Sequence, residues 1–267
     1  MIRLPAVAGR FYPAEAEILN KQISGFVSGT SEKMRALGCV VPHAGYVYSG
    51  HVAGAVYASI EIPRKCILLG PRHFPRGEPL AILTQGSFAT PLGEAQIDTE
   101  LAAALAREYP RLREDAVAHA QEHSLEVQIP FLQCLAKDFQ FVPVVLATDR
   151  YGALEDLGRA VAIVIAGANE PVLAIASTDM NHYEDDAVTR VKDARAIERI
   201  LALDSRGLFD TVRGEGISMC GYAATTAMLV AMRELGATEA RLVRYATSAD
   251  AGAGREQVVG YAGIVIR

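Results

Sequence analysis

The chain has 267 residues, of which 51% are apolar, and a formal net charge of −5. This length and composition suit a single α/β domain over residues 1–267 with a sizeable core. The acidic balance, without any cluster of lysine and arginine, argues against nucleic acids and anionic membranes as partners. No apolar run approaches the roughly 18 residues that a membrane span needs, so we expect a cytoplasmic protein.

Apolar runs and segments of helical spacing alternate along the chain after an extended arm over residues 1–13. We predict strands that end at His43 and at Gly70, an antiparallel excursion over 80–95, and strands over 139–147, 171–177, 240–245 and 257–266. We predict helices over 14–30, 50–60, 100–108 with Thr99 as N-cap, 122–135, 151–165, 185–203, 205–213 and 222–235. This alternation is typical of an α/β domain with a mostly parallel or mixed central sheet flanked by helices.

Two histidines follow buried strands at equivalent points. His43 comes directly after the run Cys39-Val40-Val41-Pro42, and His73 comes after Cys66-Ile67-Leu68-Leu69-Gly70-Pro71-Arg72. Ligands and metals bind beyond the carboxyl ends of the strands in open α/β sheets. A single histidine of this kind is most often a hydrogen-bonded loop or core residue, but two at matching strand ends indicate a metal site or an acid–base site.

A third strand delivers Asp179 and His182 just beyond its end at Ser177. A carboxylate beside an imidazole fixes the tautomer of the histidine and raises its basicity. The alternative is a helix N-cap at Asp179 with a histidine on the surface, and the recurring position at a strand end favours a functional pair.

His123 and Glu126 are three residues apart in a segment that we expect to be helical, so we predict that they share one helical face. The pair suits a general base with an orienting carboxylate, or a metal ligand with its partner. An exposed pair at a helix N-terminus is an equally good interpretation. Cys220 comes directly before a predicted helix. If its thiol faces the N-terminus of that helix, the pKa of the thiol is lowered. If the thiol is packed in the interior, it is unreactive.

Several motifs, in their order along the chain, resemble those of the Memo family. They are Ala8-Gly9-Arg10-Phe11-Tyr12-Pro13, Pro42-His43-Ala44-Gly45-Tyr46, Gly70-Pro71-Arg72-His73, Glu122-His123-Ser124-Leu125-Glu126, Ser177-Thr178-Asp179-Met180-Asn181-His182-Tyr183, Cys220-Gly221 and Tyr245-Ala246-Thr247-Ser248. The resemblance covers essentially the whole chain. Bacterial and archaeal members are called protein B of the AmmeMemoRadiSam system, and the family is similar in fold to class III extradiol ring-cleaving dioxygenases, which use non-haem Fe(II).

The resemblance implies that His43 and His73 bind a metal, Fe(II) or another divalent ion. It implies that Asp179 and His182 line the same pocket, with His182 as the acid–base histidine, and that His123 and Glu126 belong to a motif of the family. Animal members have a cysteine as third ligand, and Ala251 stands near that position here. Alanine cannot bind a metal, which leaves Asp250, Asp179 or His182 as substitutes.

Three functions remain open at this point. The first is a metal-dependent, dioxygenase-like enzyme in which His43 and His73 hold the metal and His182, oriented by Asp179, moves a proton. The second is a binding or accessory protein whose pocket takes a peptide or an anionic small molecule, with a radical SAM protein as partner. A hydrolase that uses a divalent metal with the Asp179/His182 pair is a third interpretation.

Overall fold

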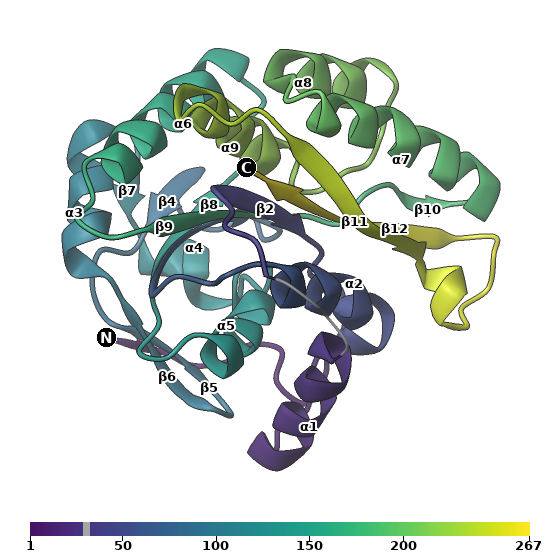
Figure 1. The fold of residues 1–267 in the computed structure, drawn as a ribbon, viewed down its shortest axis with the longest axis horizontal. Helices are drawn as coiled ribbons and strands as arrows, with labels where there is room; N and C mark the ends of the chain where they lie inside the picture. Colours follow the sequence, from purple (N-terminus) through teal and green to yellow (C-terminus); the bar gives the residue numbers. More distant parts are fainter. Residues whose placement is uncertain (29–32) are drawn as a thin grey trace.

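The computed structural model describes residues 1–28 and 33–267 of the chain (Figure 1). The strands are β1 (Ile2–Arg3), β2 (Gly38–Val41), β3 (Lys65–Pro71), β4 (Leu80–Ile82), β5 (Ser87–Thr90), β6 (Gly93–Ile97), β7 (Arg113–Glu114), β8 (Gln140–Leu146), β9 (Val172–Ser177), β10 (His182–Glu184), β11 (Ala240–Thr247) and β12 (Val258–Ile266). The helices are α1 (Ala16–Val27), α2 (Tyr46–Ser59), α3 (Thr99–Glu108), α4 (Ala116–Ala120), α5 (Ile129–Leu135), α6 (Tyr151–Ala166), α7 (Asp186–Leu201), α8 (Ser205–Gly214) and α9 (Tyr222–Glu234). Two short 3-10 helices, η1 (Glu126–Gln128) and η2 (Ser248–Ala251), complete the described elements.

The strands form one mixed sheet whose centre is parallel. The central order is β8-β3-β9-β2, all parallel, and β12 joins β2 in the antiparallel direction. Every residue of β2 and β9 is buried, as expected of parallel strands that are covered on both faces. The expected α/β architecture is therefore confirmed.

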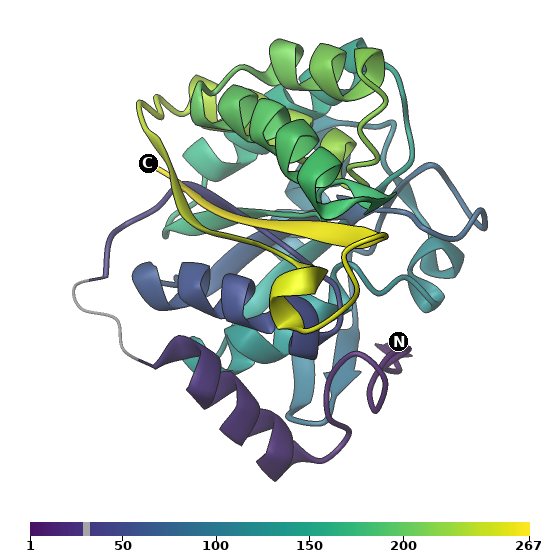
Figure 2. The ribbon, with the colours of Figure 1, turned by 90° about the vertical axis from the view of Figure 1, so that its right-hand side faces the viewer.

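Helices cover both faces of this sheet. In Figure 1, α6, α7, α8 and α9 lie above it and α1, α2 and α5 lie below it. Figure 2 shows the β11–β12 hairpin passing between α7 on one side and α2 on the other. Ten of the fourteen residues of α2 are buried, because this helix is held between the sheet and α1.

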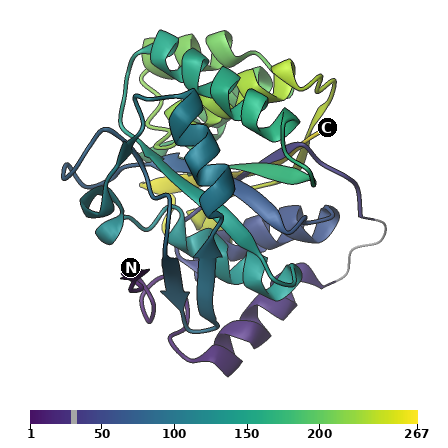
Figure 3. The same cartoon turned by 90° about the vertical axis from the view of Figure 1, so that its left-hand side faces the viewer.

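The first residues of the chain extend the sheet at its other edge. β1 pairs with β5, and β5 forms an antiparallel hairpin with β6, which Figure 3 shows beside the N-terminus. The antiparallel excursion expected over residues 80–95 is thus confirmed. The arm that follows β1 runs back toward α2, where the backbone N–H of Tyr46 donates to the carbonyl oxygen of Phe11 at 2.7 Å.

Some expected boundaries are wrong. α2 begins at Tyr46 instead of residue 50, because the buried side chain of Tyr46 is placed by packing, which overrides its modest helix propensity. The N-cap of α3 is Asp98, whose carboxylate accepts from the N–H of Leu101, and Thr99 is the first helical residue. The end of the expected helix over 14–30 reaches residues outside the described part.

The expected helix over residues 122–135 is also wrong in its first half. Residues 121–125 form a turn, η1 follows, and the α-helix starts only at Ile129. Pro130 lies in the first turn of α5, where its missing N–H costs no hydrogen bond. The proline therefore marks the start of a helix and does not kink a longer one.

Candidate metal centre

A cavity of about 780 Å³ opens beyond the carboxyl ends of β2, β3 and β9. Because these three strands are parallel neighbours, the connections that leave them meet at one edge of the sheet. Imidazoles, aromatic rings and small apolar side chains form its walls. The lining residues are Arg10, Phe11, His43, Ala44, Gly45, Val47, Tyr48, His73, His123, Asp179, His182, Tyr183, Ser218, Cys220, Ser248, Ala253, Val259 and Tyr261.

His43 is buried, and a chain of hydrogen bonds fixes its ring. Its Nδ1 lies 2.9 Å from the Oγ of Ser177, which itself donates to the carbonyl oxygen of Ser124 and accepts from Gln128. The hydroxyl hydrogen of Ser177 is thus already used, so Nδ1 of His43 carries the proton. Its Nε2 has no proton and faces the thiol of Cys220, whose Sγ lies 3.3 Å away in the wall of the cavity.

His73 is fixed in the same way by a carboxylate. Its Nδ1 lies 2.8 Å from Oε1 of Glu122, and a carboxylate can only accept, so Nδ1 is the donor. The N–H groups of His73 and Ser124 also donate to Glu122. A Cβ at Gly70 would lie 2.7 Å from the side chains of Ser124 and Leu125. Glycine at this point of β3 therefore lets the segment with Glu122 approach the strand end.

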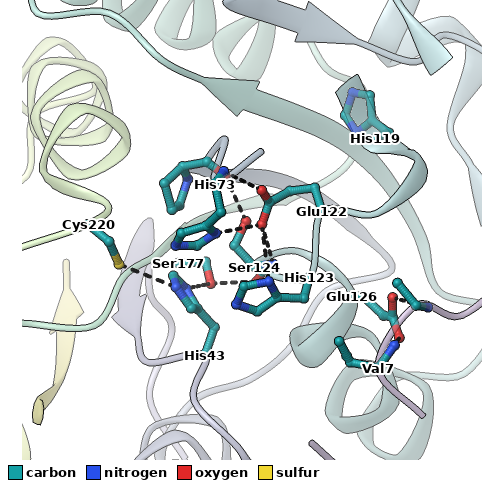
Figure 4. Close-up of polar contacts among 12 residues, drawn as sticks. Val7, His43, His73, His119, Glu122, His123, Ser124, Glu126, Ser177 and Cys220 are labelled. Carbon is teal, nitrogen blue, oxygen red and sulfur yellow. Dashed lines mark hydrogen bonds and ion pairs between the residues drawn. The ribbon is translucent and has the colours of Figure 1, made fainter. Parts of the chain in front are cut away.

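His123 completes a group of three imidazoles with His43 and His73 (Figure 4). One ring nitrogen from each lies within 4.8 Å of the others. The rings of His73 and His123 stack with centroids 4.5 Å apart, and the ring of His43 meets that of His123 edge-on at 5.6 Å. This is the one group of three or more potential metal-binding side chains that the described residues contain.

Burial and the charge of Glu122 together determine the pKa values of the three rings. It holds the pKa of His43 well below its ordinary value, with a further contribution from His73, and it lowers the pKa of His123 to about 4. Burial also opposes protonation of His73, but the hydrogen bond and charge of Glu122 outweigh it and raise that pKa. Burial would raise the pKa of Glu122, but its bonds to His73 and Ser124 lower it to about 2. Glu122 is thus the charged partner behind a group of imidazole donors.

Asp179 and His182 line the same cavity but make no direct hydrogen bond to each other in the described structure. Asp179 is buried, which raises its pKa, and its Oδ1 accepts from the backbone N–H of His43 at 2.7 Å. The Nδ1 of His182 lies 2.8 Å from the carbonyl oxygen of Ser218, which can only accept, so Nδ1 carries a proton. The expectation that Asp179 orients His182 is therefore wrong, because Ser218 has this role.

Glu126 lies outside the cavity, and its expected pairing with His123 is wrong. His123 is in the turn before η1, so the two side chains do not share a helical face and point in different directions (Figure 4). Glu126 forms a buried ion pair with Arg3 and accepts from the hydroxyl of Tyr12 at 2.6 Å. It also accepts from the N–H groups of Ala6 and Val7. Glu126 thus holds the N-terminal arm, and its proposed catalytic role has no support from its position.

The substitutes considered for a third ligand do not join the imidazole group. Asp250, in η2 beside Ala251, is paired with Arg190 at 2.8 Å and does not line the cavity. Asp179 and His182 line it without belonging to the group of three. Cys220 lies 3.3 Å from Nε2 of His43, but burial raises the pKa of its thiol, so the lowered pKa considered for it is wrong.

Three contributors were absent from the sequence prediction of the site. Ser177 and Ser218 orient histidines, and Glu122 supports His73. No periodicity marks them, since each acts through a turn or a strand end. The one available signal was that Glu122 directly precedes a candidate histidine.

Comparison with known proteins agrees with the resemblance of the motifs. The family model for Memo-like protein matches residues 3–265. A MEMO1 family protein of Methanopyrus kandleri is 42% identical, with 100% of this chain and 99% of the relative covered. Similar proteins of Pyrobaculum arsenaticum, 40% identical with 99% and 98% covered, and of Methanothermobacter thermautotrophicus, 39% identical with 98% and 99% covered, carry the same family name. No helix in the described part of the chain is long and apolar enough to cross a membrane.

Proposed function

This chain belongs to the Memo family, and from that premise we propose that it is a cytoplasmic metal-dependent enzyme that acts on a small organic substrate by a dioxygenase-like reaction. His43, His73 and His123 would hold the metal, with Fe(II) expected first. The observation that carries the proposal is the convergence of three imidazole nitrogens, from three separate connections, within 4.8 Å at the floor of a cavity.

The donors fit a divalent first-row metal. Imidazole suits iron, zinc, copper and nickel, and two of the three rings have a pKa lowered by burial, which keeps them neutral and able to bind. When bound, such an ion would supply Lewis acidity and, if it is iron, redox chemistry toward oxygen. Glu122 would raise the basicity of His73, as carboxylates behind metal-binding histidines do.

His182 is the best candidate for moving a proton. Its Nδ1 donates to the carbonyl of Ser218, and the ring, with Nε2 as its second nitrogen, lines the cavity. Imidazole exchanges protons near neutral pH. Asp179 would contribute a second group for the substrate, since its carboxyl is buried in the same wall and burial raises its pKa.

A second candidate is a binding or accessory protein that works beside a radical SAM partner and binds a peptide or small molecule in the same cavity. Non-haem iron oxygenases commonly use two histidines and one carboxylate, whereas the third donor here is an imidazole and Ala251 stands near the position of the animal cysteine. This departure favours the second candidate. Three histidines also form known zinc sites, so zinc would favour the hydrolase interpretation.

Metal content tests the proposal. Protein purified without oxygen is compared with the double variant His43→Ala/His73→Ala by elemental analysis. His51→Ala is the matched control, because His51 lies in α2 outside the cavity. We expect near-stoichiometric iron in the wild type and the control and none in the folded double variant.

Two results would contradict this expectation. If the double variant retained iron, His43 and His73 would not be ligands of the metal. No metal in the wild type after reconstitution with Fe(II) would favour the binding protein, and a chelator-independent partner recovered from native lysate would then identify its function.

A further inference from the structure

Arg10 provides the one lysine or arginine side chain among the described residues that line the cavity. It lies at the tip of a turn closed by a bridge between Ala8 and Tyr12, and Gly9 before it has a φ of +77°. Within the described structure, its guanidinium has no hydrogen bond or ion pair. Most arginines in the described part of the chain form a hydrogen bond or an ion pair. An arginine without either, at the mouth of a cavity, is available to bind a ligand.

The position of Arg10 is fixed by its neighbours. On one side, Glu126 holds Val7 and Tyr12 through bonds of 3.0 and 2.6 Å. On the other side, Tyr46 binds the carbonyl of Phe11, and the ring of Phe11 meets His123 edge-on at 4.9 Å. The turn is therefore held at both ends, and one of its residues contacts a candidate metal ligand. The turn fixes the backbone of Arg10, so only its side chain has to be ordered when a ligand binds.

The mouth of the cavity is apolar and aromatic. Val47, Tyr48 and Tyr183 line it and remain 67%, 42% and 72% exposed. Exposed apolar side chains gathered around a cavity mark a binding surface more often than scattered ones do. Tyr183 also has a φ of +61°, a conformation rarely adopted by bulky residues and typical of functional sites.

We propose that the cavity binds a small molecule that combines a flat apolar ring with one carboxylate or phosphate group. The anionic group binds Arg10 at the mouth, and the ring packs against Phe11, Tyr48 and Tyr183 in front of the histidines. As the substrate class of the enzyme, this inference rests on the proposed function, whereas the binding itself does not require the metal. The volume of about 780 Å³ is that of a small-molecule site.

The guanidinium of the cavity lies at its mouth. Arg10 is exposed at the rim, whereas the carboxyl group of Asp179 is buried at the inner wall. A guanidinium binds carboxylate and phosphate through two parallel hydrogen bonds. The ligand is thereby oriented with its apolar ring toward the histidines.

Matched probes test the inference on chelator-treated protein. Phenylacetate and 2-phenylacetamide have nearly the same shape and differ in charge, and phenyl phosphate distinguishes a phosphate from a carboxylate. Dissociation constants are measured by calorimetry for the wild type, Arg10→Gln and Arg10→Lys, with Arg107→Gln, exposed on α3, as control. We expect Arg10→Gln to weaken both anions about tenfold, Arg10→Lys to weaken them less, and the amide to bind equally to all.

Tyr183→Ala should weaken all three probes to a similar extent, because it removes ring contact and not charge. Circular dichroism confirms that each variant is folded. Equal affinity of the wild type for phenylacetate and its amide, no binding of any probe, or anion binding that does not respond to Arg10→Gln would overturn the inference. Failure to bind metal, with anion binding through Arg10 retained, would contradict the proposed function alone.

Discussion

Glu122 and Glu126 are four residues apart and both are buried, yet they serve different parts of the molecule. Glu122 accepts from His73 and supports the imidazole group. Glu126 accepts from Arg3, Tyr12 and two backbone N–H groups of the arm. A turn separates Glu122 from Glu126, which is the first residue of η1, and the two side chains point to different parts of the molecule (Figure 4). Two carboxylates that are close in the sequence can therefore belong to different sites.

The largest expected effect follows from Glu126→Gln. It leaves the buried guanidinium of Arg3 without its counter-charge, and removing one partner of a buried ion pair costs about 3 kcal/mol or more of unfolding free energy. Urea unfolding measures the loss, with Glu108→Gln, exposed on α3, as control. The metal affinity of this variant should stay close to that of the wild type. A large fall in metal affinity would show that Glu126, like Glu122, supports the metal centre.

A third buried carboxyl, that of Asp193, sharpens the comparison, because no lysine or arginine of the described residues forms a hydrogen bond with it. Burial raises its pKa to about 7, against a backbone N–H from Asn181 and the hydroxyl of Tyr245. Since an unfolded aspartate titrates near 3.9, this group stabilises the fold fully below about pH 4 and loses that contribution as the pH rises through about 7. The contribution of Asp193 to the free energy of unfolding falls by about 3 kcal/mol between about pH 5 and pH 8.

Asp193→Asn tests this dependence, since asparagine keeps both hydrogen-bond positions without ionising. The difference in unfolding free energy between variant and wild type, measured by urea unfolding across this range, should move in favour of the variant as the pH rises. A difference that stays constant with pH would show that Asp193 does not titrate in this range.

Glu122→Gln should have the smallest effect on stability and a clear effect on metal. Replacing a carboxylate behind a metal-binding histidine lowers metal affinity about 10- to 100-fold. Competition with a chelator measures this affinity, and urea unfolding shows whether the fold is affected less than in Glu126→Gln. A variant with unchanged metal affinity would separate Glu122 from the metal centre.

The sequence predicted what depends on strands and missed what depends on turns. His43, His73 and Asp179 follow buried apolar runs, and the parallel sheet brings such strand ends together. His123 and Glu126 were assigned to one helix because the apolar spacing of the segment continues through the turn before Ile129. Spacing does not reveal where a helix begins, and the proline at residue 130 was the better signal.

The partners of the histidines lay beyond sequence reasoning for a related reason. Ser218 reaches His182 across 36 residues and Ser177 reaches His43 across 134. Such pairs form because elements distant in the chain pack together, and no local pattern specifies them. The unpaired Arg10 is recognisable only when the whole hydrogen-bond network around the cavity is known.

The long reach of Glu126 has a consequence for how the molecule assembles during synthesis. Its partners Arg3 and Tyr12 precede it by 123 and 114 residues. The first dozen residues therefore emerge from the ribosome long before the carboxylate that holds them has been synthesised. The β11–β12 hairpin differs, because each of its strands pairs with the strand next to it in the sequence. Each of the three clustered histidines is synthesised before residue 126. The wall that carries Arg10 and Phe11 can thus be fixed by Glu126 only after all three of the clustered histidines have been synthesised.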